Sequence, residues 1–185
     1  MARRPTTAKT TEVVERPILW QPHPGAQTKF LASSVAEVMY GGAAGGGKSD
    51  CLLVDALRGC NTPRYSAILF RRTYPDLIEL IERSRELYSA FGGTYNGSEH
   101  IWRFPSGARV KFSHLQHDRD ELAHKSIEYQ YIAFDELTSF TEAQYRFLFS
   151  RLRSSRGIPM LMRSATNPGD RGHEWVLRRW APWLL

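Results

Sequence analysis

A glycine-rich segment in the first third of the chain has the residue types and spacing of a phosphate-binding loop. Two glycines separated by four residues are followed by Lys48 and Ser49. Glycines let backbone N–H groups converge on phosphate oxygens, and a helix beginning at the loop adds the positive end of its dipole. Lys48 would reach the β- and γ-phosphates, and the Ser49 hydroxyl would bind Mg²⁺. The predicted nucleotide-binding residues are Gly42, Ala43, Ala44, Gly45, Gly46, Gly47, Lys48 and Ser49.

Two adjacent carboxylates form a second candidate site. The apolar residues 131–134 are followed directly by Asp135 and Glu136. Asp135 would hold the metal, directly or through water, and Glu136 would orient and deprotonate an attacking water molecule. Alone, such a pair is often a solvated strand end. Together with the loop, it predicts Mg²⁺-dependent hydrolysis of ATP.

A third polar site follows the apolar residues 158–165. Thr166 and Asn167 come directly after this run and before Pro168-Gly169. A polar side chain at this position lies beside the γ-phosphate in loop ATPases, so we expect Thr166 or Asn167 to sense that phosphate. The alternative is an ordinary Asn-Pro-Gly turn.

The elements that position these sites are predicted from apolar periodicity and from turn residues. The predicted helices cover residues 25–34, 48–59, 75–91, 141–153 and 172–180. The predicted strands cover residues 36–40, 66–70, 129–134 and 158–165, with an antiparallel hairpin at 101–104 and 108–112. Strands alternating with helices indicate an α/β domain with a mostly parallel sheet and helices on both faces. The carboxyl ends of its strands, and therefore the candidate sites, would meet at one edge.

Length and composition are those of one globular domain. The chain has 185 residues and a formal net charge of +6, which weakly suggests a polyanionic partner. We expect a flexible tail over residues 1–16 and one ATPase domain over 17–185. No run approaches the ~18 apolar residues of a membrane span, so no membrane partner is expected. Cys51 and Cys60 would lie about 13 Å apart along one helix, too far for a disulfide, which predicts reduced thiols.

Four motifs occur together in one order along the chain. They are the loop at 42–49, Phe-Asp-Glu-Leu-Thr-Ser-Phe-Thr at 134–141, Ser-Arg-Leu-Arg-Ser at 150–154 and Ala-Thr-Asn-Pro-Gly at 165–169. Over about residues 22–180, this set resembles the ATPase domain of the large terminase subunit, the DNA-packaging motor of tailed double-stranded DNA bacteriophages. The resemblance implies a RecA-like P-loop NTPase fold of the additional-strand, catalytic-glutamate class, with an inserted β-hairpin.

The resemblance also implies partners and residue roles. The partners are double-stranded DNA, the portal protein of the procapsid, the small terminase subunit and further copies in a ring, usually a pentamer, in the host cell cytoplasm. Gln27 matches the glutamine that reads adenine. The other matches are Lys48 and Ser49 in the Walker A loop, Asp135 and Glu136 as the Walker B and catalytic carboxylates, and Thr166 and Asn167 in the motif that couples hydrolysis to movement.

The chain departs from the family pattern in two respects. Many large terminases have an arginine or lysine early in the loop, where this chain has Ala43 and Ala44. A charge-stabilising finger would then come from elsewhere, and the candidates are Arg71, Arg72, Lys125, Arg151 and Arg153. Arg151 and Arg153 lead this set, and the finger would act either within its own chain or on a neighbouring subunit's nucleotide. Large terminases also carry a C-terminal nuclease domain with clustered acids, whereas Glu174 is the one acidic residue after Asp170, so no nuclease activity is expected of this chain.

A motor that moves any genome should contact DNA phosphates without sequence preference. The available cations are Arg103, Arg109 and Lys111 on the hairpin and Arg171, Arg178 and Arg179 near the C-terminus. Trp102 and Trp175 lie among these cations, and we expect both to pack in the core or on the hairpin.

Three other functions share parts of this pattern. A small P-loop kinase fits the chain length, but adjacent carboxylates favour activation of water. A helicase or recombinase-type ATPase core normally needs a second motor domain or a filament interface. A nucleotide-binding assembly module without turnover would bind ATP and release no phosphate.

Overall fold

The computed structural model describes residues 18–42, 45–155, 157–181 and 183. The predicted tail at 1–16 and both Ala43 and Ala44 lie outside the described residues. The α-helices are α1 (Ala26–Ala32), α2 (Lys48–Ala56), α3 (Tyr74–Tyr88), α4 (Glu142–Phe149) and α5 (His173–Trp180). The 3-10 helices are η1 (Leu57–Gly59), η2 (Ser89–Phe91), η3 (Asp120–His124) and η4 (Leu137–Ser139). The strands are β1 (Glu37–Gly41), β2 (Ser66–Arg71), β3 (Thr94–Asn96), β4 (Ile101–Arg103), β5 (Arg109–His114), β6 (Tyr131–Asp135) and β7 (Leu161–Thr166).

One seven-stranded sheet, in the order β1-β7-β6-β2-β5-β4-β3, organises the chain. The strands from β1 to β5 in this order pair in parallel, and β4 and β3 continue the sheet antiparallel. The predicted mostly parallel α/β sheet is therefore confirmed. The predicted hairpin is also confirmed, because β4 pairs antiparallel with β5.

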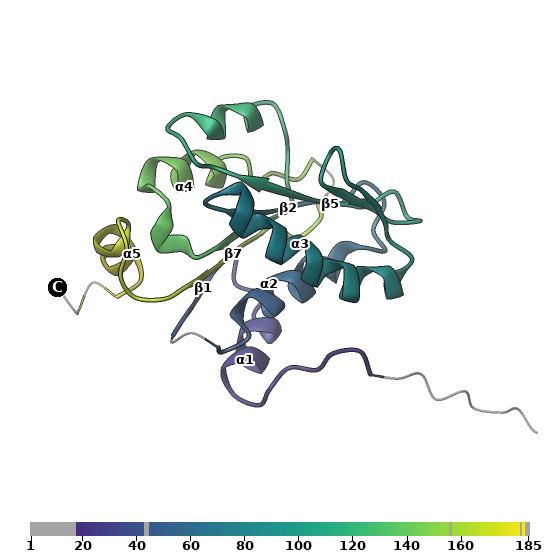
Figure 1. Ribbon diagram of the computed structural model, residues 1–185, viewed down its shortest axis with the longest axis horizontal. Coiled ribbons are helices and arrows are strands. Elements are labelled where there is room, and N and C mark those ends of the chain that lie inside the picture. Colours follow the sequence, from purple (N-terminus) through teal and green to yellow (C-terminus); the bar gives the residue numbers. More distant parts are fainter. Residues whose placement is uncertain (1–17, 43–44, 156, 182, 184–185) are drawn as a thin grey trace, which may run out of the picture.

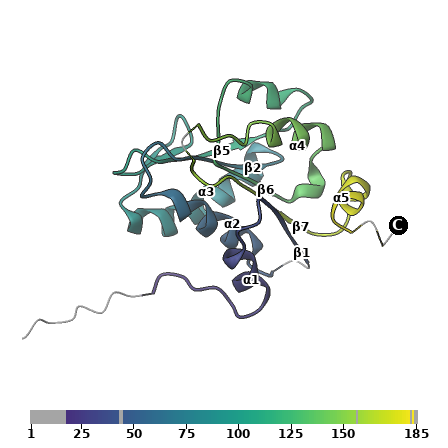
Figure 2. The same ribbon diagram turned by 180° about the vertical axis from the view of Figure 1, so that it is seen from behind.

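Helices cover both faces of the sheet (Figures 1 and 2). They bury alternate strand residues. On β2, Ala67 and Leu69 pack in the core under α1, α2 and α3. Ile68 and Phe70 point to the other face and pack in the core that includes α4 and α5. This alternation follows from the two-residue period of a strand buried on both sides.

The strand register aligns the carboxyl ends of the parallel strands. Gly41 of β1 is opposite Thr166 of β7, and Asp135 of β6 is opposite Ala165. Phe70 of β2 is opposite Phe134, so Arg71 follows at the same edge. The sites predicted from separate segments therefore meet at this carboxyl edge.

Several predicted boundaries were wrong, each for a local reason. The helix predicted at 141–153 ends at Phe149, because the backbone beyond it turns to pair with Tyr129. The strand predicted from residue 158 begins at Leu161, since Pro159 has no N–H to donate. The short strand β3 was not predicted. It forms by pairing with β4 rather than from its own sequence pattern.

Thr141 caps α4 through a reciprocal capping box with Gln144. Cys51 and Cys60 are free and buried, and burial raises the pKa of the Cys51 thiol to about 12. Within the described ranges, no helix is both long and apolar enough to cross a bilayer.

Candidate functional site

A cleft of about 410 Å³ lies at the carboxyl edge of the sheet. Its lining comes from the loop before α2, the start of α2, and the ends of β6 and β7. The lining residues are Gly45, Gly46, Gly47, Lys48, Ser49, Asp50, Asp135, Glu136, Thr166 and Asn167. The fold thus gathers the described loop residues, the carboxylates and the two polar residues at the end of β7 around one cavity.

The loop leads into α2 through a left-handed residue. Gly47 has φ 60°, a left-handed conformation that favours glycine, and a Cβ there would lie 2.5 Å from Nε2 of Gln27 and displace that amide. The Lys48 ammonium donates to the Gly42 carbonyl oxygen at 3.2 Å. Because α2 begins at Lys48, its first-turn N–H groups have no partner within the helix. This is the geometry of an anion site at a helix N-terminus.

Gln27 supports the loop from behind. Its Nε2 donates to the Gly46 carbonyl oxygen at 2.9 Å, and its Oε1 accepts from the His23 N–H at 2.7 Å. Gln27 is buried and does not line the cleft. Both ends of the Gln27 carboxamide are therefore hydrogen-bonded to the backbone. Recognition of adenine by Gln27 stays a prediction, and it requires one of these hydrogen bonds to be replaced by a bond to the base.

Arg71 joins the two carboxylates. Its Nε and Nη2 contact the same oxygen of Asp135, Oδ2, at 2.8 and 2.7 Å, and its Nη1 lies 3.3 Å from Oε1 of Glu136. Asp135 is 3% exposed and the Arg71 side chain 12% exposed, so the pair is largely desolvated. The sequence suggested Arg71 only as one finger candidate. Arg71 is the last residue of β2, and β2 lies beside β6, which ends in Asp135, so the pairing depends on the strand order of the sheet.

Glu136 is held in an uncommon backbone conformation. Its φ of 58° and ψ of 57° are left-handed, which is rare for a residue with a side chain. Burial raises the pKa of its carboxyl above the ordinary value, and the Arg71 guanidinium opposes that rise. A carboxylate with a raised pKa binds a proton more readily, as a general base must.

The end of β7 is bonded to the turn that follows Glu136. The Thr138 N–H donates to Oγ1 of Thr166 at 3.3 Å, and the Thr166 hydroxyl donates to Oγ1 of Thr138 at 3.1 Å. Oδ1 of Asn167 is buried, with no hydrogen-bond partner among the described residues. A buried acceptor of this kind needs a donor from water or from a ligand.

The charged and polar groups that line the cleft fit a nucleoside triphosphate with Mg²⁺. Lys48 and the start of α2 would face the phosphates, and magnesium prefers oxygen ligands such as the Ser49 hydroxyl and the Asp135 carboxylate. The unpartnered Oδ1 of Asn167 adds an acceptor at the same cavity.

The leading finger candidates lie away from this cleft. The Arg153 N–H donates to the Tyr129 carbonyl oxygen at 3.0 Å. Nε2 of Gln130, just before β6, donates to the Arg153 carbonyl oxygen at 2.8 Å. Arg151 donates to the Lys125 carbonyl oxygen, and its guanidinium lies 5.4 Å from the centre of the Phe147 ring. Both arginines therefore lie near the amino end of β6, and a role at a neighbouring subunit's nucleotide stays a prediction.

Arg72 is likewise used within the chain, since it donates to the carbonyl oxygens of Leu115 and Gln116 and to Oε1 of Gln144. Trp102 and Trp175 are buried, as predicted, and their indole N–H groups donate to Ser84 and to the Phe140 carbonyl oxygen.

Comparison with solved structures shows the same fold in phage packaging proteins. The large terminase of a thermophilic bacteriophage matches with a TM-score of 0.70 at 13% identity, over 89% of this chain and 43% of that protein. The Phi-28 gp11 DNA packaging motor matches with a TM-score of 0.50 at 18% identity, over 78% of this chain and 50% of that protein. The chain thus spans at most half the length of either relative. No curated protein sequence matches it.

A family model provides the identification. The model for the N-terminal part of the terminase large subunit, T4likevirus type, matches residues 39–184. This range begins within β1 and contains the described loop residues, Asp135, Glu136, Thr166 and Asn167. The RecA-like packaging fold expected from the motif order is thereby confirmed, and the chain belongs to the terminase large subunit family, of which it represents the N-terminal domain.

Proposed function

We propose that this domain hydrolyses ATP with Mg²⁺ and that hydrolysis drives double-stranded DNA into a procapsid. The observation that carries the proposal is the placement of Lys48 and the loop across one cleft from Asp135 and Glu136. Membership of the terminase large subunit family supports the packaging role.

The chemistry follows from the positions of the charged groups. Glu136 accepts a proton from a water molecule, whose oxygen attacks the γ-phosphorus while the bond to the β–γ bridging oxygen breaks, leaving ADP and phosphate. Lys48 and the amides at the start of α2 stabilise negative charge on the phosphates. Magnesium, when bound, supplies further charge neutralisation. Arg71 holds Asp135 and restrains Glu136, so it positions both carboxylates.

The product state can be transmitted through hydrogen bonds behind the cleft. The Ser139 hydroxyl donates to Asp170 at 2.7 Å, and the Gly172 N–H donates to the Thr138 carbonyl oxygen at 2.7 Å. A Cβ on Gly172 would lie 2.6 Å from that oxygen, so the two segments are in close contact. Loss of the γ-phosphate at Asn167 and Glu136 would move this turn and, with it, the start of α5.

The partners of this activity are part of the proposal. The domain would work in a homo-oligomeric ring, usually a pentamer, docked on the portal protein, with DNA delivered together with the small terminase subunit in the host cell cytoplasm. A finger from a neighbouring copy, such as Arg151 or Arg153, would complete the charge stabilisation that Ala43 and Ala44 do not supply.

A phosphate-release assay with and without double-stranded DNA and procapsids tests the proposal. We expect both additions to stimulate turnover, and Lys48→Ala to abolish it. Tight ATP binding with no phosphate release under any condition would instead support a nucleotide-binding assembly module.

A further inference from the structure

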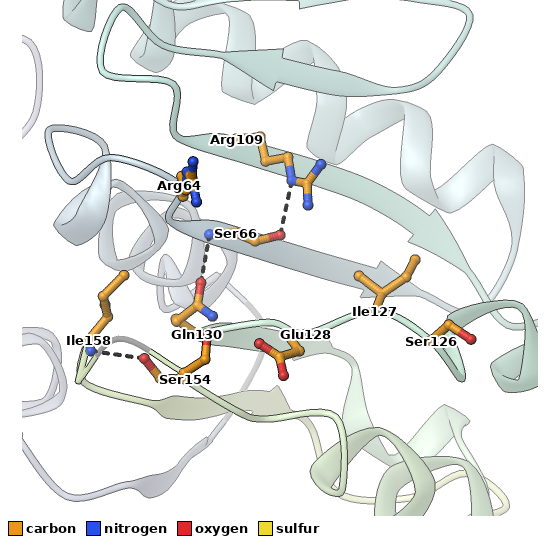
Figure 3. A pocket seen from close by; sticks show the side chains of 10 residues that line it. Arg64, Ser66, Arg109, Ser126, Ile127, Glu128, Gln130, Ser154 and Ile158 are labelled. Carbon is orange, nitrogen blue, oxygen red and sulfur yellow. Dashed lines mark hydrogen bonds between the residues drawn. The ribbon is translucent and has the colours of Figure 1, made fainter.

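A second cavity, of about 300 Å³, lies at the amino edge of the sheet, where β2 and β5 begin. Figure 3 shows it between Arg64, Ser66 and Arg109 on one side and Glu128, Gln130 and Ser154 on the other. A neighbouring cavity of about 190 Å³ shares Ser66, Arg109 and Ile127 and extends along β5 to Lys111. We call the two together the amino-edge groove.

The groove presents a row of cations on a fixed support. Arg109 and Lys111 are two residues apart on β5, so they share a face of the strand about 7 Å apart. Nε of Arg109 donates to Oγ of Ser66 at 3.3 Å, and the Ser66 N–H donates to Oε1 of the buried Gln130 at 2.9 Å (Figure 3). These bonds fix the groove floor and anchor the Arg109 guanidinium through its Nε.

The charges in the groove are not balanced within the chain. Among the described residues, no ion pair involves Arg64, Arg109 or Lys111, and Glu128 is the one acidic residue lining either cavity. Of the other predicted DNA-contacting arginines, Arg103 and Arg179 are paired, whereas Arg171 and Arg178 form no ion pair among the described residues but line neither of these two cavities. Arg103 lies 2.6 Å from Glu99, and Arg179 contacts Glu37 at 2.5 and 2.9 Å. The groove therefore gathers several cations without an ion-pair partner at one cavity, where they can contact an external anion.

We propose that the amino-edge groove binds backbone phosphates of double-stranded DNA, an inference that rests on the proposed packaging function. Arginine guanidinium groups match phosphate oxygens with paired N–H donors. The serine hydroxyls of the lining add donors that distinguish no base. An acidic protein partner is disfavoured, because protein interfaces centre on apolar and aromatic anchors, whereas the larger cavity has only Ile127 and Ile158 as apolar lining.

The position of the groove separates DNA contact from ATP chemistry. Strand β2 runs from Ser66 at the groove to Arg71 at the cleft, about 17 Å along the strand. Removal of charge at the groove should therefore leave ATP hydrolysis without DNA unchanged.

The test is duplex binding by the full chain, measured by fluorescence anisotropy with two DNA duplexes of about 30 base pairs and unrelated sequence over a salt series. We expect Arg64→Gln with Arg109→Gln to weaken both complexes by at least about tenfold at about 0.1 M salt. The slope of log K against log salt should fall by about 2, one for each phosphate that the variant no longer neutralises. Glu128→Gln removes the opposing charge and should strengthen binding, whereas the matched control Arg103→Gln should change it less than about twofold.

The outcomes separate the groove from the proposed function. The groove assignment would be overturned, and the proposed function would stand, if the double variant bound DNA with wild-type affinity and salt slope and Glu128→Gln did not strengthen binding. DNA binding that depends on the groove, in a wild-type chain that releases no phosphate from ATP, would overturn the proposed hydrolysis and uphold the groove. All variants alter exposed side chains, and a thermal melt equal to the wild type confirms that they fold.

Discussion

Charged side chains are arranged differently at the two edges of the sheet. At the carboxyl edge, Arg71 contacts both Asp135 and Glu136 in a largely desolvated cluster. At the amino edge, Arg64 and Arg109 are exposed and, among the described residues, form no ion pair. Fixed, paired charges suit a reaction because little reorganisation is needed as charge develops. Exposed cations suit a polyanion because they exchange bound counterions for phosphates.

The largest expected difference between the edges is in turnover, after the same Glu→Gln substitution at each edge. Glu136→Gln removes the proposed base, so turnover should fall by about 10²–10⁴-fold while ATP affinity stays within about twofold. Glu128→Gln makes the same change at the amino edge and should leave turnover without DNA unchanged. Phosphate release and equilibrium nucleotide binding measure both variants. A fully active Glu136→Gln enzyme would refute the assigned role.

The second difference concerns stability. Arg71→Gln leaves Asp135 buried without its partner, which should lower the free energy of unfolding by about 3 kcal/mol. Arg103→Gln removes an exposed pair with Glu99, in which the side chains are 52% and 49% exposed, and should cost about 0.5 kcal/mol or less. Urea denaturation of both variants compares the two. Equal losses of unfolding free energy would show that the buried Arg71–Asp135 pair contributes no more to stability than an exposed ion pair.

A smaller effect tests the hydrogen bonds between Thr138 and Thr166 behind the cleft. Thr166→Val removes the acceptor of the Thr138 N–H and should lower the free energy of unfolding by about 1–3 kcal/mol. Thr166→Ser keeps the hydroxyl and should retain most of that stability. Urea denaturation measures this step as well, and DNA-stimulated turnover of the two variants reports on coupling. If valine and serine behave alike in both assays, the hydroxyl link carries no coupling.

The smallest predicted change is a shift in pH dependence. Because burial raises the pKa of Glu136 above 4.5, kcat/KM should fall as the pH is lowered through a midpoint above that value. Since the Arg71 charge lowers the same pKa, Arg71→Gln should move the midpoint to higher pH. A pH–rate profile measures both midpoints. A midpoint unaffected by Arg71→Gln would mean that Glu136 is not the titrating base.

The residues that meet at the carboxyl edge could be identified from the sequence because its motifs are local. Lys48 and Ser49 follow their glycines directly, and Asp135 and Glu136 end an apolar strand, so each site is visible in a few consecutive residues. Their convergence then follows from the handedness of strand–helix–strand connections.

The rest depends on contacts between distant segments. Arg71 and Asp135 are 64 residues apart, and their pairing requires the order β6-β2 within the sheet. The amino-edge groove combines residues from β2, β5 and the segments before β2, β6 and β7, and apart from Ser154 none of them lies in a sequence motif. The end of α4 at Phe149 was missed because a backbone pairing with Tyr129 overrides local helix propensity.

The most direct test of the account is a crystal structure of the chain with Mg²⁺ and a non-hydrolysable ATP analogue. We expect the β- and γ-phosphates on the backbone of residues 45–49, within reach of Lys48, with Asp135 and Glu136 facing the terminal phosphate. A nucleotide bound elsewhere, or a cleft that stays empty at saturating analogue, would contradict it.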